Sequence, residues 1–256
     1  MKYPRVAKIR LICYTLPTLF MADIKANNPV VDKMFKAGAH FAFSRTRRHP
    51  TIAPYIFGVK NKVEIFDLEK TSELLAKAQT FIASLAKEGK AVLFVGGKSE
   101  ARSAVKTGAL SLNMPYVDGR WIGGTLTNFV QIRKRVEKME KLTMEKEKGE
   151  LAKYTKKERL LIDREIANLE RFFSGIVSMK DLPKALFIVD PKNEKNAVKE
   201  AQDMGIPVIA LLGSDCNIKG IDYPIVGNDS SQASVQFFVQ EITKAYSDAK
   251  AEVKKA

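Results

Sequence analysis

The segment ALFIVDPKNEKNAVKEAQDMGIPVIALLG, residues 185–213, decides the fold. It begins and ends with runs that are apolar at every position, which favours strands covered on both faces in a parallel sheet. Between these runs, charged and apolar residues alternate at helical spacing. We interpret Asp190 as the cap and Pro191 as the first-turn proline of a helix that ends at Met204. The segment therefore predicts a strand, a helix and a second strand.

The same alternation continues on both sides of this segment. Further strand candidates are KVEIFD (62–67), AVLFVGG (91–97) and DYPIVG (222–227), with helical patterns at 69–87 and roughly 230–248. The predicted caps of the last helix are Asn228, Asp229 and Ser230. Repeated strand–helix units of this kind predict an α/β fold, a parallel sheet sandwiched by helices.

A long charged stretch interrupts this pattern. The chain between the strand near Tyr116 and the strand at 185 is too long for one crossover, and apolar residues recur at three- and four-residue steps on either side of Gly149. These apolar residues are Leu126, Phe129, Ile132, Val136, Met139, Leu142, Leu161, Ile162, Ile166 and Leu169. They predict two antiparallel helices, each about 30 Å long, that stand off the sheet as an inserted coiled-coil hairpin. Its charged outer faces fit either a solvated surface or an RNA-facing one.

We accordingly divide the chain into an α/β domain and three other parts. The α/β domain comprises residues 28–124 and 176–248, and the helical hairpin is inserted at 125–175. An N-terminal extension covers residues 1–27, and a C-terminal tail covers 249–256.

The first twenty residues are basic and then apolar, which superficially resembles a signal peptide. The apolar run is only about ten residues long, Pro17 interrupts it, and no small-residue cleavage site follows. A translation start at Met21 and an organellar presequence remain open alternatives. Nothing else in the sequence could span a membrane.

The composition points to a polyanionic partner. The formal net charge is +14 and the isoelectric point is about 9.6, which favours nucleic acid as the partner class. The chain has two cysteines, Cys13 and Cys216, and two histidines, His40 and His49, none at metal-ligand spacing. We therefore predict no metal, no cofactor, no small-molecule substrate and no catalytic residue.

Two segments, 45–71 and 119–129, interleave Arg and Lys with aromatic residues and Gly or Pro turns. Such segments supply cations for phosphates and flat faces for stacking. For Trp121, packing in the core is the preferred interpretation. The candidate RNA contacts, chosen for charge and location, are Arg45, Arg47, Arg48, Lys60, Lys62, Arg120, Arg133 and Lys134.

The segment VLFVGGKSEA, residues 92–101, invites comparison with a phosphate-binding loop. The Walker spacing fails because Val92 stands where the first glycine belongs, so a tight strand-to-helix turn is preferred. Lys98 and Arg102 remain able to meet a backbone phosphate there. Three aspartates near strand ends are interpreted as helix caps or turn residues: Asp67, Asp190 and Asp215.

Seven motifs resemble one known family, the bacterial-type second protein of the small ribosomal subunit. They are AGAHF (37–41), HPTIAPYIFGVKNKVEIFDLEKT (49–71), VLFVGGK (92–98), RWIGGTLTNF (120–129), LPKALFIVDP (182–191), GIPVIAL (205–211) and IDYPIVGND (221–229). They occur in the family's order and cover roughly residues 28–245. The resemblance implies a flavodoxin-like or Rossmann-like domain with a coiled-coil hairpin, placed between head and body of the small subunit, that binds ribosomal RNA without catalysis.

The basic loop departs from the family's pattern, GHF-GHQTR-x-WNP. Ala42, Phe43, Ser44 and Arg45 occupy the GHQT positions, and Arg48, His49 and Pro50 occupy the WNP positions. A histidine and a tryptophan are thus absent, which places a metal or stacking role there in doubt and favours phosphate contact. The resemblance also implies neighbouring small-subunit proteins as partners, among them the large first protein of the subunit.

We therefore predict a structural, ribosome-bound cytoplasmic protein of the small subunit that binds small-subunit ribosomal RNA. An organellar ribosome remains the less favoured location. Two other classes stay open at this point: a phosphate- or nucleotide-binding enzyme that uses Gly96, Gly97 and Lys98, and a regulatory RNA-binding protein that acts off the ribosome.

Overall fold

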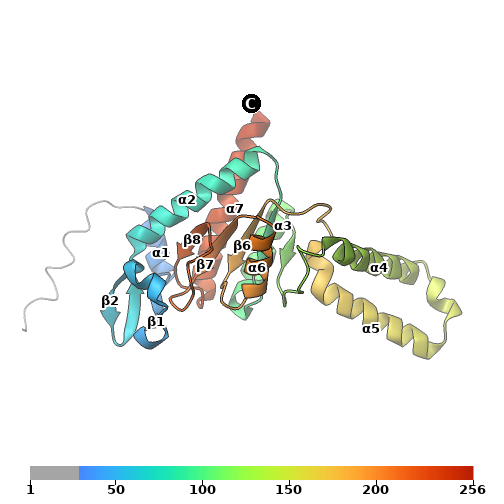
Figure 1. Cartoon of the computed structure of the whole chain (residues 1–256). Coiled ribbons are helices and arrows are strands. Elements are labelled where there is room, and N and C mark those ends of the chain that lie inside the picture. The colour runs from blue at the N-terminus through green and yellow to red at the C-terminus, as the bar shows by residue number, and fades with distance from the viewer. Residues whose placement is uncertain (1–28, 256) are drawn as a thin grey trace, which may run out of the picture.

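The computed structural model describes residues 29–255, and its centre is a five-stranded parallel sheet (Figure 1). The predictions for residues 1–27 lie outside the described residues. The strands are β4 Val92–Val95, β5 Tyr116–Val117, β6 Ala185–Val189, β7 Val208–Leu212 and β8 Tyr223–Val226. Their order is β5-β4-β6-β7-β8. Counted along the chain this is 2-1-3-4-5, the flavodoxin-like order.

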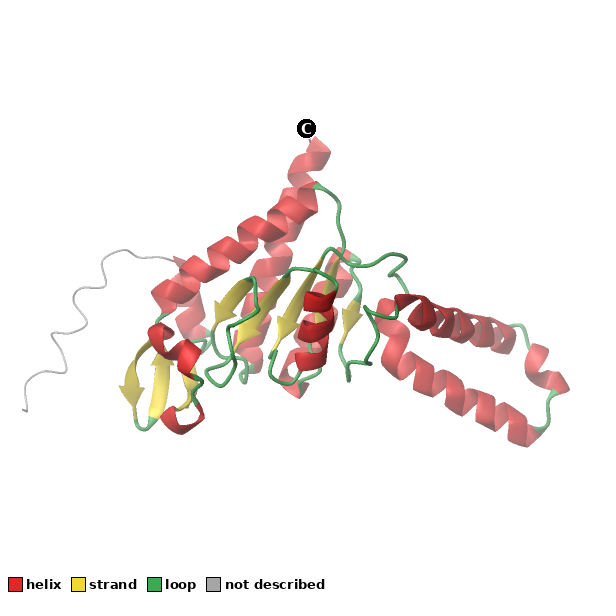
Figure 2. Ribbon diagram, in the orientation of Figure 1, coloured by secondary structure: helices red, strands yellow, loops and turns green. Residues whose placement is uncertain are grey.

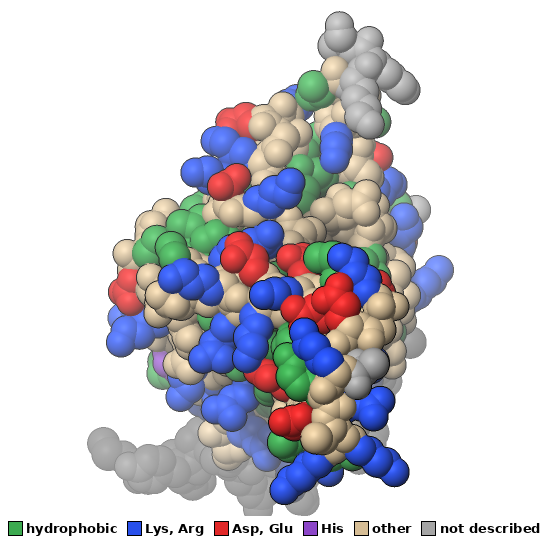
Figure 3. All heavy atoms as spheres, turned by 90° about the vertical axis from the view of Figure 1, so that its right-hand side faces the viewer, with side chains coloured by type: hydrophobic (Ala, Val, Ile, Leu, Met, Phe, Trp, Pro, Cys, Tyr) green, Lys and Arg blue, Asp and Glu red, His purple; other side chains and the backbone are tan. Residues whose placement is uncertain are grey.

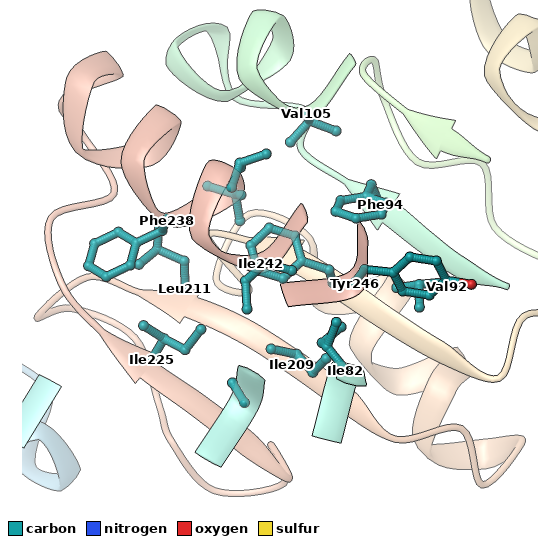
Figure 4. Packing of buried hydrophobic residues seen from close by; sticks show 14 of the residues in the cluster. Ile82, Val92, Phe94, Val105, Ile209, Leu211, Ile225, Phe238, Ile242 and Tyr246 are labelled. Atoms are coloured by element: carbon teal, nitrogen blue, oxygen red, sulfur yellow. The ribbon is translucent and has the colours of Figure 1, made fainter. Parts of the chain in front are cut away.

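Helices cover both faces of this sheet, which confirms the predicted α/β sandwich (Figure 2). Three helices cover one face: α2 Leu68–Lys87, α3 Ser99–Leu112 and α7 Gln232–Lys255. The shorter α6 Lys195–Asp203 covers the other face. Alternate strand residues serve the two layers, so Phe94 and Phe187 pack toward α7, while Leu93 and Ile188 pack toward α6. Figure 4 shows Ile242 and Tyr246 of α7 among the strand residues of the first layer.

The first three strands form a separate antiparallel sheet, in the order β1-β3-β2. They are β1 Phe41–Ser44, β2 Ile56–Lys60 and β3 Val63–Phe66, preceded by α1 Pro29–Lys36. The prediction that KVEIFD extends the parallel sheet is therefore wrong. Asn61 and Lys62 both have positive φ, 51° and 66°, which matches the two-residue turn of a β-hairpin. This turn folds β3 back onto β2, and β3 then leads directly into α2, capped by Asp67.

Two of the predicted helix starts are displaced. α6 begins at Lys195, after a turn, and Asp190 has a positive φ of 61° instead of the extended backbone of a cap. α7 begins at Gln232 and continues past 248 to Lys255. Asp190 begins the turn that precedes α6, where its Oδ1 accepts from the backbone N–H of Asn193 at 3.4 Å, so its interpretation as a turn residue is confirmed. The carboxylates of Asp190 and Asp229 also bind Lys98. No helix in the described part of the chain is long and apolar enough to cross a bilayer.

Two further helices, α4 Phe129–Glu147 and α5 Lys156–Phe173, pack against each other and project from the sheet (Figure 1). A short 3-10 turn, Glu150–Lys153, joins them, and a capping box of Thr155 and Glu158 begins α5. The residues buried on these helices are Ile132, Val136, Met139, Ile166, Leu169 and Phe173. The inward position expected for Leu161 is wrong, because its side chain is 53% exposed. The helices diverge toward their outer ends, which leaves that side chain uncovered.

Candidate nucleic-acid interface

Four of the candidate cations gather at one edge of the small sheet. The register places Ser44 of β1 and Lys60 of β2 on either side of Val63, so Arg45 follows one strand where Lys62 precedes the next. The side chains of Arg45, Lys60 and Lys62 are exposed, and that of Arg47 lies over the ring of Phe43, 5.7 Å from its centroid. These four residues, Arg45, Arg47, Lys60 and Lys62, are called the basic edge below.

Arg48, in the same loop, faces inward. Its Nη1 donates to Oε1 of Glu64 at 2.8 Å, and Glu64 has no exposed surface. Glu64 Oε2 is buried and has no hydrogen-bond partner among the described residues. A carboxylate in this position needs its cation, because an unpaired buried charge is costly. The Arg48 guanidinium therefore pairs with Glu64 of β3 and is not part of the exposed cationic surface.

The remaining candidates lie at the base of α4, across the molecule from the basic edge (Figure 1). Arg120 and Lys134 are exposed. Arg133 donates to the carbonyl oxygen of Val177 at 3.1 Å and pairs with Glu137 at 3.6 Å. Arg133 thus ties α4 to the chain that leaves α5, while Arg120 and Lys134 stay available to a partner.

The segment 119–129 binds a carboxylate of the protein itself, that of Glu200. Glu200 of α6 is buried and accepts hydrogen bonds from Trp121 Nε1 at 3.0 Å and from the backbone N–H groups of Gly124 and Leu126, at 2.8 and 3.0 Å. Trp121 is 5% exposed, so the preferred interpretation as a core residue is confirmed. Gly124 has a φ of 88°, which lets nearby backbone N–H groups converge on one anion. The segment therefore anchors the base of α4 to the sheet.

The carboxyl ends of β4 and β6 form the topological switch point, where flavodoxin-like folds bind their ligands. Here Lys98 occupies it. Its Nζ lies 3.1 Å from Asp229 Oδ2 and 3.3 Å from Asp190 Oδ2, and the lysine side chain is 18% exposed. Burial alone would lower the pKa of Lys98, but the two carboxylates together raise it. The lysine that a phosphate loop would offer to a ligand is thus neutralised internally.

The neighbouring groups close the same site. A Cβ on Gly97 would collide with a carboxylate oxygen of Glu194, so this side chain fills the space where an anion would approach the glycine. Burial raises the pKa values of Glu194, Asp229 and Cys216. Ligand atoms of Asp190, Cys216 and Asp229 lie within 4.8 Å of one another, and all three residues are buried. With Lys98 between the two aspartates, this cluster joins the chain that follows β4 to the loops that follow β6 and β8.

The two histidines have structural contacts. His40 is 9% exposed and stacks on Phe35 at 4.4 Å between ring centroids, and burial lowers its pKa. His49 Nδ1 lies 2.7 Å from the hydroxyl of Thr51 and caps the following 3-10 turn. Neither contact forms a catalytic arrangement with a nucleophile.

One cationic feature was not predicted from the sequence. A groove of about 580 Å³ lies between α6 and the loop after β7, and four exposed lysines line it. They are Lys192, Lys195, Lys199 and Lys219. The first three stand at helical spacing, a signal present in the sequence, but the fourth comes from a different loop. Only the fold brings it to the same groove.

The end of the molecule that bears α4 and α5 is also basic. Figure 3 shows Lys and Arg side chains spread over this end with acidic side chains among them. Two of the lysines pair across the two helices: Lys138 with Glu165, and Lys146 with Asp163 at 2.8 Å. Exposed apolar side chains lie among these charges: Met144, Leu160 and Leu161 are each about half exposed. This surface therefore combines cations with apolar contact area.

Comparison with known proteins agrees with the fold. The family model described as ribosomal protein S2 matches residues 34–249. A small ribosomal subunit protein uS2 from Sulfurimonas denitrificans is 43% identical over 218 residues, which are 85% of this chain and 84% of the relative. The proteins of the same name from Nitratiruptor and Coprothermobacter proteolyticus are 42% and 39% identical, over 85% and 83% of this chain and 81% and 80% of their own lengths.

Proposed function

The chain belongs to the ribosomal protein S2 family, and from this premise we propose how its surfaces bind the small subunit. It is a structural protein of the small ribosomal subunit and not an enzyme. The occupied switch point agrees with this role, because Lys98, Glu194 and the two aspartates fill the place of a ligand. What remains to be assigned is which surfaces contact which partner.

The basic edge is the primary contact with small-subunit ribosomal RNA. Arg45, Lys60 and Lys62 are exposed, and no ion pair to them occurs within residues 29–255. They project from strand ends and a tight turn, so the backbone that carries them is already ordered when their side chains meet phosphates. Arg47, stacked over Phe43, offers a planar guanidinium that can fork onto a phosphate or lie on a base.

The second contact is the projecting pair α4 and α5, which works as a coiled-coil hairpin. Its inner residues, such as Val136 and Ile166, are buried, and it extends away from the sheet on the side opposite the basic edge. A rigid body with contacts at both ends can fix two parts of the subunit relative to each other. We assign the hairpin to a second RNA or protein surface, in a location between head and body.

Protein neighbours would meet apolar surface near α1. Phe35 and Phe41 are 60% and 51% exposed on either side of the buried His40. Aromatic side chains exposed in this way are typical of protein interfaces. This surface suits the neighbouring small-subunit proteins, including the large first protein, on a ribosome that we assign to the cytoplasm.

Sedimentation tests the proposal. Tagged full-length chain is expected to co-sediment stoichiometrically with small subunits in a magnesium-containing sucrose gradient, and a high-salt wash is expected to release it. Recovery at the top of the gradient, with a tag that leaves the chain functional, contradicts the proposed role. Release that is independent of salt would contradict the phosphate contacts alone.

A further inference from the structure

The lysine groove between α6 and the loop after β7 is distinct from the basic edge, and it is a cavity instead of a projecting edge. One wall is the beginning of α6 with Lys195 and Lys199, and the other is the loop that carries Lys219. Its lining also includes the apolar side chains of Val198 and Ile221. Cations beside apolar groups suit the phosphates and riboses of a nucleic-acid backbone.

The charge of the groove is nearly uncompensated. Asp215 is the only carboxylate among the described residues that line it, and Lys192 already binds that carboxylate at 2.6 Å. The ammonium groups of Lys195, Lys199 and Lys219 make no ion pair within the described chain. Three unpaired lysines around one concave surface repel each other, so their energy falls when a polyanion enters.

The loop wall is held in place before any ligand arrives. The backbone N–H of Ile218 donates to the Thr51 hydroxyl at 3.3 Å, and Gln202 of α6 donates to the carbonyl oxygen of Gly220 at 2.7 Å. The first bond ties the loop to the segment between β1 and β2, and the second joins the two walls at one end. A preorganised groove binds without the entropy cost of ordering a loop.

The groove also continues into a basic segment assigned above. His49 lines it, and this residue lies two positions after Arg47 of the basic edge. The His49 N–H donates to the carbonyl oxygen of Ser214 at 2.8 Å, which joins the basic loop to the loop after β7. His49 therefore places the segment that carries Arg45 and Arg47 next to the groove.

We propose that this groove binds the phosphodiester backbone of a ribosomal RNA strand, with Lys195, Lys199 and Lys219 as its phosphate contacts. The inference rests on the proposed function and adds a second RNA site to it. RNA is favoured over an acidic protein because the unpaired lysines stand beside the apolar side chains of Val198 and Ile221, and because His49 links the groove to the segment that carries Arg45 and Arg47. The groove sits on the α6 face of the sheet, opposite α2 and α7.

Chemical footprinting on intact small subunits tests the site. Amine acetylation followed by mass spectrometry is expected to label Lys195 and Lys199 several-fold less in the subunit than in the free chain. A reagent that links lysine amines to nucleotides is expected to yield peptides from 192–202 or 214–221 with a nucleotide attached. Equal labelling in both states overturns the proposal, and so does protection accompanied only by links to another protein.

Salt release of variants gives an independent measurement. Lys195→Gln with Lys199→Gln is expected to leave the subunit at lower salt than wild type, with the slope of log affinity against log salt reduced by about 1 for each lost phosphate contact. Lys77→Gln with Lys244→Gln removes the same charge from exposed positions on α2 and α7 and is expected to match wild type. Thermal melts check that both pairs fold equally.

The outcomes separate this inference from the proposed function. A chain that never joins small subunits contradicts both. A chain that joins them with its groove lysines fully reactive, or whose groove variant is released like wild type, contradicts the groove alone and leaves the ribosomal role standing.

Discussion

Trp121 donates its indole N–H to Glu200 at 3.0 Å, although 79 residues separate them in the chain. The intervening chain contains the whole of α4 and α5. The buried carboxylate of Glu200 on α6 therefore holds the segment 119–129, which leads from β5 into α4. It fixes the direction in which α4 leaves the sheet.

Replacing this carboxylate is expected to be strongly destabilising. Glu200→Ala leaves the indole N–H and three backbone N–H groups without their acceptor, and each unsatisfied buried donor costs about 1–3 kcal/mol. We expect a loss of at least about 3 kcal/mol in the free energy of unfolding, measured in urea. Glu200→Gln keeps one acceptor oxygen and should lose less. Equal stability of Glu200→Ala and wild type would refute the anchoring role.

Arg48 and Arg45 should behave differently although both lie in the basic loop. Arg48→Met strands Glu64 as an unpaired buried charge, for which about 3–5 kcal/mol of stability is lost. Arg45→Met changes an exposed side chain and should alter stability by less than about 0.5 kcal/mol. Retention on small subunits in rising salt, measured per folded molecule, should fall more for Arg45→Met than for Arg48→Met. A stable Arg48→Met chain contradicts the assignment.

His40 should make stability depend on pH. Its pKa is lowered by burial, so its contribution is complete above the ordinary histidine pKa of about 6.5 and is lost as the pH falls toward the lower folded value. We expect urea midpoints measured between pH 7.5 and 5.5 to fall less for His40→Gln than for wild type. Parallel curves for wild type and His40→Gln exclude this effect.

Urea midpoints of Lys98→Met should rise, and not fall, as the pH is lowered. Without the ammonium, Asp190 and Asp229 face each other as buried carboxylates, and the variant should lose stability at pH 7.5. Burial already raises the pKa of Asp229, so acidification protonates it and should restore part of the loss by pH 5.

Millimolar ATP or GTP should not raise the melting temperature of wild type. Stabilisation by either nucleotide would reopen the ligand site.

The outer part of the hairpin should be required for binding but not for folding. Leu160→Ser with Leu161→Ser changes two half-exposed side chains and should leave the melting temperature nearly unchanged. It is expected to weaken retention on small subunits. Ile166→Ser is the contrasting variant, because that side chain is buried and its loss should cost about 2–4 kcal/mol. Full retention of the double variant would remove this surface from the binding model.

Much of the fold was predictable because its strands are short apolar runs bounded by Gly, Pro or Asp residues. The runs 185–189 and 208–212 are buried at every position, as their composition predicts. β3 was misassigned because a four-residue strand, VEIF, has the same composition in either sheet. Its partner depends on the turn at Asn61 and Lys62, and neither residue is a glycine that would have signalled a positive φ.

The site was less predictable because charge on its own does not indicate what a side chain contacts. Arg48 and Arg133 look like Arg45 in the sequence, yet they bind Glu64 and Val177 of the protein itself. The buried Glu200 does leave a signal, since it lies on the apolar side of α6 beside Ala197 and Ala201. Lys219 leaves none, because it joins the groove only through the folded loop.

The position of Lys98 has a consequence for how the sheet completes its folding. A diffusible ligand that binds only the folded state stabilises it only while that ligand is present. In this chain, the ammonium between Asp190 and Asp229 is part of the polypeptide and is present from synthesis. Folding of the sheet therefore needs no metabolite at this position.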